Sequence, residues 1–122
     1  MKILVVDDDP DILEALKRKL EDIGHAVETA QCASDSLDML DLFKATGVDL
    51  IMTDYNMPGG MNGLELGREI RERGFKMPIW LVTGSNINKE VAKSAGITQV
   101  ISKGTFELFE AIKRLNQKGK EV

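Results

Sequence analysis

Residues 48–58, VDLIMTDYNMP, contain an apolar strand that ends directly at a carboxylate, Asp54. Three other short apolar runs also end at polar side chains. These runs and the polar residues that follow them are 3–6 with Asp7 and Asp8, 79–82 with Thr83, and 99–102 with Lys103. If the four strands lie parallel, their carboxyl ends meet at one edge of a sheet. Two or three carboxylates, one hydroxyl and one lysine would then lie together there, as a site for a divalent cation and a phosphoryl group requires.

Short apolar runs and helical patterns alternate five times along the chain. The expected strands are 3–6, 26–30, 49–53, 79–82 and 98–102, and the expected helices cover about 12–23, 37–43, 62–74, 88–95 and 108–115. A glycine separates four of these helices from the next strand, which is typical of helix ends. Strands that are apolar on both faces indicate a parallel sheet covered on both sides. The pattern therefore predicts an α/β fold with a doubly wound, five-stranded parallel sheet, and it leaves the strand order open.

Local signals support two of the helix starts. Asp9 precedes Pro10, and such a pair caps a helix and occupies its first turn. Asn62 and Glu65 have the spacing of a capping box. His25 follows the glycine of a turn, and we expect its side chain to be exposed.

Length and composition restrict the class of protein. The chain has 122 residues, which suffices for one domain, so we expect residues 1–122 to form a single domain. The net charge of −4 argues weakly against nucleic-acid binding. No apolar run approaches the roughly 20 residues that cross a bilayer. Cys32 is the only cysteine, and the chain begins almost directly with a strand, so we expect a cytoplasmic protein.

The acidic residues suggest a metal site. Carboxylates packed beside Asp54 repel each other by roughly 4 kcal/mol per pair at about 4 Å, with an effective dielectric constant near 20. A bound cation would neutralise that repulsion, and ligands that are all oxygens favour magnesium, manganese or calcium over zinc. Thr83 could donate a hydrogen bond to a phosphoryl oxygen, and Lys103 could pair with it as a point charge. Asp54 could act as the nucleophile that forms an acyl phosphate.

With these motifs the chain resembles response-regulator receiver domains of the single-domain chemotaxis kind, from Lys2 to about Gln117. The resemblance rests on four stretches in order: ILVVDDDP from residue 3, DYNMP from residue 54, LVTG from residue 81, and Ser102-Lys103. It implies a flavodoxin-like sheet of order 2-1-3-4-5. It also implies that Asp54 is the phosphoacceptor, that Thr83 moves to meet the phosphoryl group, and that Lys103 pairs with it. The Mg²⁺ ligands that it implies are Asp7, Asp8, Asp54 and the backbone carbonyl of Asn56. It also implies phosphoryl transfer from a histidine kinase or histidine phosphotransfer protein, an output protein that the sequence does not name, and a monomer or weak dimer.

Three departures from the family pattern affect the expected switch. Gly104 replaces the proline that usually follows the lysine, and Val100 replaces a frequent aromatic residue. The loop at 59–63 is longer by one residue than the usual pattern. We therefore expect activation to be carried by Thr83, the loop at 85–88 and the fourth helix, with a small response at Val100.

Two alternatives remain open from the sequence. The chain could be a receiver-like module that binds partners without phosphorylation, which Gly104 and Val100 leave open and intact Asp54 and Lys103 oppose. It could also be a small phosphatase of the haloacid dehalogenase type, although the stretch at 7–11 lacks the threonine of that motif. A nucleotide-binding protein is disfavoured because the chain has no glycine-rich phosphate loop.

Overall fold

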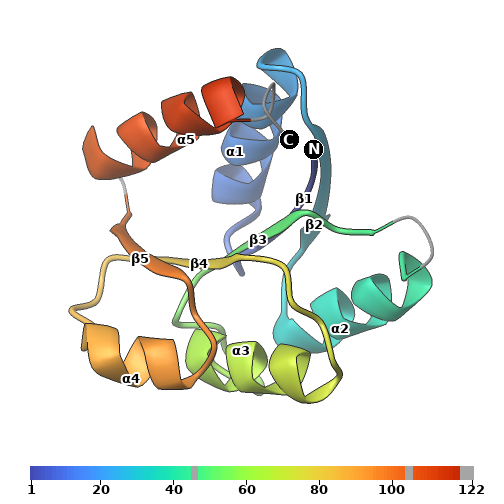
Figure 1. Cartoon of the computed structure of the whole chain (residues 1–122), viewed down its shortest axis with the longest axis vertical. Coiled ribbons are helices and arrows are strands. Elements are labelled where there is room, and N and C mark those ends of the chain that lie inside the picture. Colours follow the sequence, from blue (N-terminus) through green and yellow to red (C-terminus); the bar gives the residue numbers. More distant parts are fainter. Residues whose placement is uncertain (45–46, 104–105, 119–122) are drawn as a thin grey trace.

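The protein has a five-stranded parallel sheet of order β2-β1-β3-β4-β5, as predicted (Figure 1). The structure is a computed structural model that describes residues 1–44, 47–103 and 106–118. The strands are β1 (Lys2–Val6), β2 (Ala26–Ala30), β3 (Leu50–Thr53), β4 (Ile79–Thr83) and β5 (Gln99–Ser102). The helices are α1 (Pro10–Asp22), α2 (Ala33–Leu42), α3 (Gly63–Glu72), α4 (Lys89–Ser94) and α5 (Phe106–Lys118).

The helices form two layers, with α1 and α5 on one face of the sheet and α2, α3 and α4 on the other (Figure 1). Each face has its own hydrophobic core. Leu13, Leu20 and Ile112 pack in the core under α1 and α5, whereas Leu40 and Ile70 pack in the core on the opposite face. The fold is therefore the doubly wound α/β sandwich that the alternating pattern predicts.

Strand β1 shows why the apolar runs are continuous. Ile3 and Val5 belong to the core under α1 and α5, while Leu4 and Val6 belong to the core on the other face. All four side chains are at most 1% exposed. Because successive side chains of a strand point to opposite faces, a strand covered on both sides needs apolar residues at every position.

Both predicted helix starts are present. The Asp9 side chain accepts a hydrogen bond from the Asp11 amide at 2.9 Å, and Pro10 occupies the first position of α1. The Asn62 side chain accepts from the Glu65 amide at 2.8 Å, and the Asn62 amide donates to the Glu65 carboxylate at 3.0 Å. These caps fix where α1 and α3 leave the sheet edge at which Asp7 and Asp54 lie.

His25 contradicts the sequence prediction, because its side chain is buried with 8% of its surface exposed. Ala26 pairs with Lys2 in the sheet, and this pairing brings the Met1 amine within 3.1 Å of His25 Nδ1. Burial and the positive charge of that amine lower the pKa of His25 from its ordinary value. The glycine before His25 correctly indicates a turn. A turn signal does not determine whether neighbouring segments bury the side chain that follows it.

Within the part of the chain that the structure describes, every helix is too short or too polar to span a bilayer.

Candidate functional site

The sheet register brings the ends of four strands together at one edge. Val6 pairs with Thr53, and the Asp54 amide donates to the Val6 carbonyl at 2.9 Å, so Asp7 and Asp54 are neighbours across β1 and β3. On the other side, the Lys103 amide donates to the Thr83 carbonyl at 2.9 Å. The acidic, hydroxyl and lysine side chains therefore meet at the carboxyl ends of the strands, as the sequence predicts.

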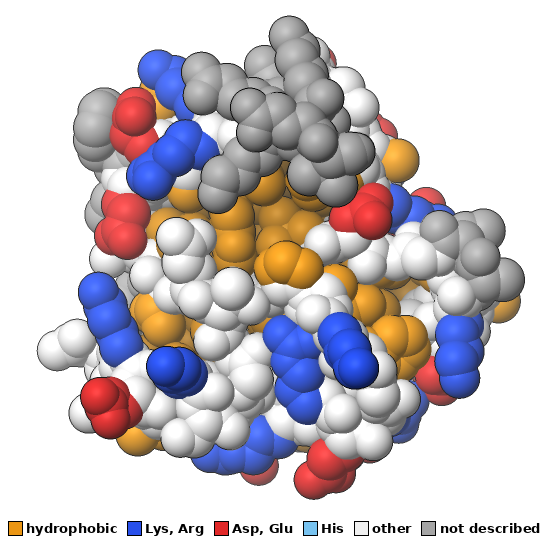
Figure 2. Space-filling view, viewed as in Figure 1, with side chains coloured by type: hydrophobic (Ala, Val, Ile, Leu, Met, Phe, Trp, Pro, Cys, Tyr) orange, Lys and Arg blue, Asp and Glu red, His pale blue; other side chains and the backbone are white. Residues whose placement is uncertain are grey.

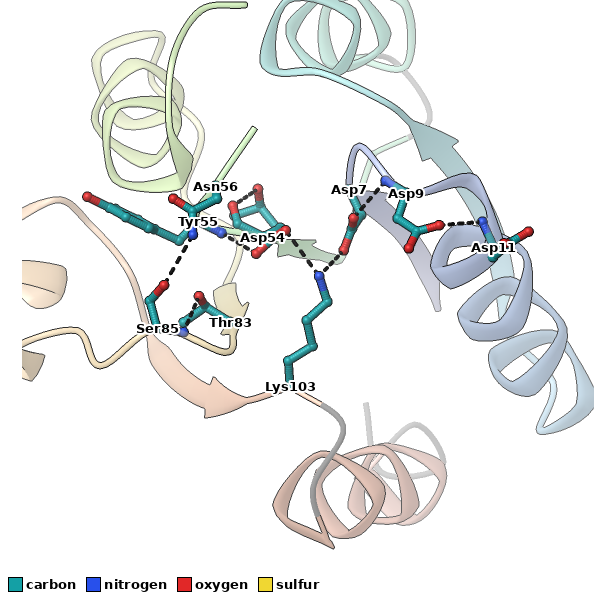
Figure 3. Close-up of polar contacts among 10 residues, drawn as sticks. Asp7, Asp9, Asp11, Asp54, Tyr55, Asn56, Thr83, Ser85 and Lys103 are labelled. Atoms are coloured by element: carbon teal, nitrogen blue, oxygen red, sulfur yellow. Dashed lines mark hydrogen bonds and ion pairs between the residues drawn. The ribbon is translucent and has the colours of Figure 1, made fainter. Parts of the chain in front are cut away.

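Three carboxylates form the centre of this edge. Oxygen atoms of Asp7, Asp8 and Asp54 all lie within 4.8 Å of one another. Asp7 and Asp54 are buried, with 4% and 8% of their surface exposed, whereas Asp8 is exposed. Backbone amides orient the two buried groups: the Asp9 amide donates to Asp7 at 2.9 Å, and the Tyr55 amide donates to Asp54 at 2.7 Å (Figure 3).

Lys103 bridges the two buried carboxylates. Its Nζ atom lies 2.7 Å from Asp7 Oδ2 and 3.1 Å from Asp54 Oδ2 (Figure 3). Burial alone lowers the pKa of Lys103, but hydrogen bonds and charge interactions with Asp7 and Asp54 outweigh it and raise the pKa from its ordinary value of 10.5. The lysine thus offsets much of the repulsion that we expected from the sequence. The single ammonium group balances only one of the two buried carboxylates, and Asp8 has no ion-pair partner among the described residues. The cluster therefore keeps a net negative charge.

The donor set fits a hard divalent cation. The three carboxylates supply only oxygen ligands, one of them open to solvent, and such sites suit Mg²⁺, which retains water and shares its shell with phosphate oxygens. The role of the Asn56 carbonyl as a further ligand stays a prediction.

Around Thr83, at the end of β4, the contacts of the site are neutral hydrogen bonds. Thr83 is buried, and its Oγ1 accepts from the Ser85 amide at 3.0 Å. The side-chain amide of Asn56 donates to Ser85 Oγ at 3.1 Å, which links the loop after β3 to the loop after β4 (Figure 3). We did not predict this link, because the sequence gives Ser85 only as a residue of a loop two positions after Thr83.

Gly63 is a second residue whose importance the sequence did not indicate. Its amide donates to the Tyr55 carbonyl at 2.9 Å. A Cβ atom at this position would clash with the backbone carbonyl of Asp54 and with the side chain of Leu81. A glycine is therefore needed where α3 passes closest to the end of β3.

The departures from the family pattern fall on both described and undescribed residues. Val100 is half-buried and packs against the core under α2, α3 and α4. Gly59, in the longer loop, has a φ of +81°, a conformation that suits glycine. Gly104 lies outside the described residues.

Comparison with known proteins identifies the class of protein. Residues 3–116 match the family model of the response regulator receiver domain. The chain therefore belongs to the receiver domains of two-component response regulators, which confirms the family resemblance.

Curated relatives give a more particular comparison. The chain is 36% identical over 117 residues to the response regulator MprA of Mycobacterium sp. (strain KMS), covering 94% of this chain and 49% of the relative. It is 34% identical, with the same coverage of both chains, to the response regulator MprA of Mycobacterium bovis (strain BCG / Pasteur 1173P2). The chain thus spans about half the length of the curated relatives that it matches.

Solved structures agree with the fold. The response regulator TrrA of Thermotoga maritima, in complex with Mg²⁺ and BeF, has a TM-score of 0.77 at 33% identity, covering 93% of this chain and 97% of that one. The chemotaxis protein CheY4 of Vibrio cholerae has a TM-score of 0.80 at 29% identity, covering 93% and 96%. These neighbours confirm the predicted flavodoxin-like fold with strand order 2-1-3-4-5.

Proposed function

We propose that this domain accepts a phosphoryl group from a phosphohistidine onto Asp54, in a reaction that depends on Mg²⁺. The observation that carries the proposal is the contact of one ammonium group, that of Lys103, with both Asp7 and Asp54 at the edge where three carboxylates meet. The similar protein TrrA forms a complex with Mg²⁺ and BeF, which supports a Mg²⁺-dependent reaction.

In the proposed transfer, an oxygen atom of Asp54 attacks the phosphorus atom in line with the bond to the donor imidazole. The new P–O bond forms as the P–N bond breaks, and the electron pair of that bond leaves with the imidazole. The protein contributes position and charge neutralisation. The Tyr55 amide already holds one oxygen of Asp54 in place.

Lys103 exchanges partners during this reaction. It pairs with Asp54 Oδ2 before transfer, and it would pair with the phosphoryl oxygens afterwards while it keeps its contact with Asp7. Thr83 would donate its hydroxyl hydrogen to another phosphoryl oxygen. Asp7, Asp8 and Asp54, with the Asn56 carbonyl, would hold the Mg²⁺ ion, which supplies charge neutralisation for the phosphoryl group when bound.

The proposed setting is cytoplasmic signalling. The phosphoryl donor would be a histidine kinase or a histidine phosphotransfer protein, and the output would pass through protein contacts or a further phosphoryl transfer. We propose that residues 1–122 act as one receiver domain, as a monomer or weak dimer, with no turnover beyond its own phosphorylation and dephosphorylation. The expectation that nucleic acid is not bound applies to these residues alone, since the relatives are about twice as long.

Intact-mass measurement after incubation with acetyl phosphate and Mg²⁺ tests the proposal. We expect one added phosphoryl group in the wild type and in Asp38→Asn, a control on the exposed surface of α2. We expect none in Asp54→Asn and none after chelation of the metal. Full labelling of Asp54→Asn would overturn the assignment. Continuous turnover of p-nitrophenyl phosphate would favour the phosphatase, and failure of the wild type to label would favour the phosphorylation-independent module.

A further inference from the structure

A groove lies at the edge of the sheet opposite Asp54, where α2 and α3 end and β3 and β4 begin. We name it the basal groove, and its volume is about 410 Å³. The residues that line it are Leu40, Phe43, Lys44, Gly47, Val48, Gly74, Phe75, Lys76 and Met77. A volume of this size falls within the range of about 300–1,000 Å³ that is usual for ligand sites.

The basal groove has an apolar interior. Leu40 and Val48 form part of the buried core, with 1% and 9% of their surface exposed. Phe43, Phe75 and Met77 pack against that core but are only half-buried. Large apolar side chains that stay partly open along a concave surface are typical of protein contact sites.

The rim of the groove is positively charged. Lys44 and Lys76 are exposed, and neither has an ion-pair partner among the residues that the structure describes. The ammonium group of Lys2 lies 3.6 Å from the centre of the Phe43 ring. None of the described residues that line the groove is acidic.

Lysines near the ends of α2 and α3 also stabilise those helices through the helix dipole. That role does not require an apolar groove between them. On the face that Figure 2 shows, hydrophobic side chains are also visible between polar ones, and both basic and acidic side chains lie around them. The basal groove combines an apolar interior with exposed lysines at its rim.

We propose that the basal groove binds an acidic amphipathic segment of a partner protein, with one or two large apolar side chains inserted between Phe43 and Phe75 and carboxylates facing Lys44 and Lys76. Charge complementarity favours this occupant over a basic one or a purely apolar one. Because the groove lies at the far edge of the sheet, such a partner would leave the Asp54 edge open. The proposal does not rest on the phosphoryl chemistry proposed above.

A second groove supplies a matched control. It lies along α4 and β5, and it too contains two exposed lysines, Lys89 and Lys93. The variants Lys44→Glu/Lys76→Glu and Lys89→Glu/Lys93→Glu change the net charge equally, so they separate a specific site from general attraction between charges. All four lysines are on the surface, and circular dichroism would verify that both variants are folded.

The probe is a synthetic acidic peptide in which glutamates flank two leucines and one phenylalanine, with a comparison peptide that has lysine at each glutamate. Amide NMR titration of the isotope-labelled protein should give shifts centred on residues 43, 44, 47, 48 and 74–77 with the acidic peptide only. Affinity should fall about tenfold in Lys44→Glu/Lys76→Glu and less than about twofold in Lys89→Glu/Lys93→Glu. The proposal is overturned by the absence of shifts at these residues, by equal loss in both variants, or by equal binding of the basic peptide.

Discussion

The two sides of the Asp54 edge are held by interactions of different strength. On the side of β1 and β3, Asp7 and Asp54 are buried, and a single ammonium group pairs with both. On the side of β4, neutral hydrogen bonds join Thr83 to the Ser85 amide and the exposed Ser85 to the exposed Asn56. Charge-assisted hydrogen bonds are roughly twice as strong as neutral ones. We infer that the charged side is arranged before a phosphoryl group arrives and that the neutral side rearranges.

The largest expected effect tests how rigidly the charged side is built. Gly63→Ala should destabilise the protein by about 2–3 kcal/mol, because the added methyl group meets the Asp54 carbonyl and the Leu81 side chain. Gly60→Ala is the control, since a Cβ there has open space and the backbone is ordinary. Urea unfolding measures both, and equal stability of the two variants would show that the backbone beside Asp54 yields easily.

The second largest effect is expected when Lys103, which pairs with both Asp7 and Asp54, is replaced. Lys103→Met should lower the free energy of unfolding by about 1–2 kcal/mol near neutral pH, because Asp7 and Asp54 lose their shared partner. Lys76→Met, at an exposed lysine, should change it by less than about 0.5 kcal/mol.

The stabilisation that Lys103 provides should also depend on pH in a defined direction. The folded pKa of Lys103 is raised above its ordinary value of 10.5, so its stabilisation is fully present below 10.5 and is lost as pH rises through the folded pKa. The difference in stability between wild type and Lys103→Met should therefore be constant from neutral pH to pH 10.5 and shrink above it. A difference that grows with pH in that range would contradict the pairing.

A smaller effect of opposite sign is expected at Asp8. Without metal, Asp8→Asn should raise the thermal midpoint by about 2–4 °C, because it relieves repulsion from Asp7 and Asp54. Asp54→Asn should raise it less, because that change also removes a partner of Lys103. Asp38→Asn serves as the surface control.

Adding Mg²⁺ to the same thermal unfolding measurement tests the metal site itself. Millimolar Mg²⁺ should raise the midpoint of the wild type by mass action and that of Asp8→Asn by less. A wild-type midpoint that is indifferent to Mg²⁺ would count against the metal site.

The smallest expected change is at Val100. Adding Mg²⁺ with beryllofluoride, a phosphoryl mimic, should shift the amide NMR signals of Thr83 and residues 84–95 strongly and that of Val100 weakly. A ligand shifts an equilibrium only through differential contacts, and Val100 has no ring to reorient. Large changes centred on Val100 and α5, with residues 84–95 quiet, would show that the neutral side does not carry the switch.

The sequence predicted the features that depend on local pattern. The caps at Asp9 and Asn62 follow from residue type and spacing, and the position of Asp7 and Asp54 at the same sheet edge follows from parallel strands that end in acids. The order of the strands came from the family resemblance alone, because the apolar pattern of a parallel strand does not identify its neighbours.

The features that the sequence did not reveal depend on contacts that tertiary packing creates between residues distant in the sequence. Gly63 reads as an ordinary residue of a capping box, and only the packing of α3 places it against Asp54. Lys103 was expected to pair with a phosphoryl group, but its contact with two carboxylates depends on the reach of one flexible side chain. The burial of His25 depends on sheet pairing that starts at the first residues of the chain.

The residue that carries the phosphoryl group is the strongest test of Asp54 as the phosphoacceptor. After labelling with acetyl phosphate and Mg²⁺, borohydride reduction converts an aspartyl phosphate into homoserine, which peptide mass spectrometry can assign to one residue. We expect homoserine at position 54 and aspartate at positions 7, 8 and 9. Homoserine at any of those three positions, with Asp54 unmodified, would contradict this assignment.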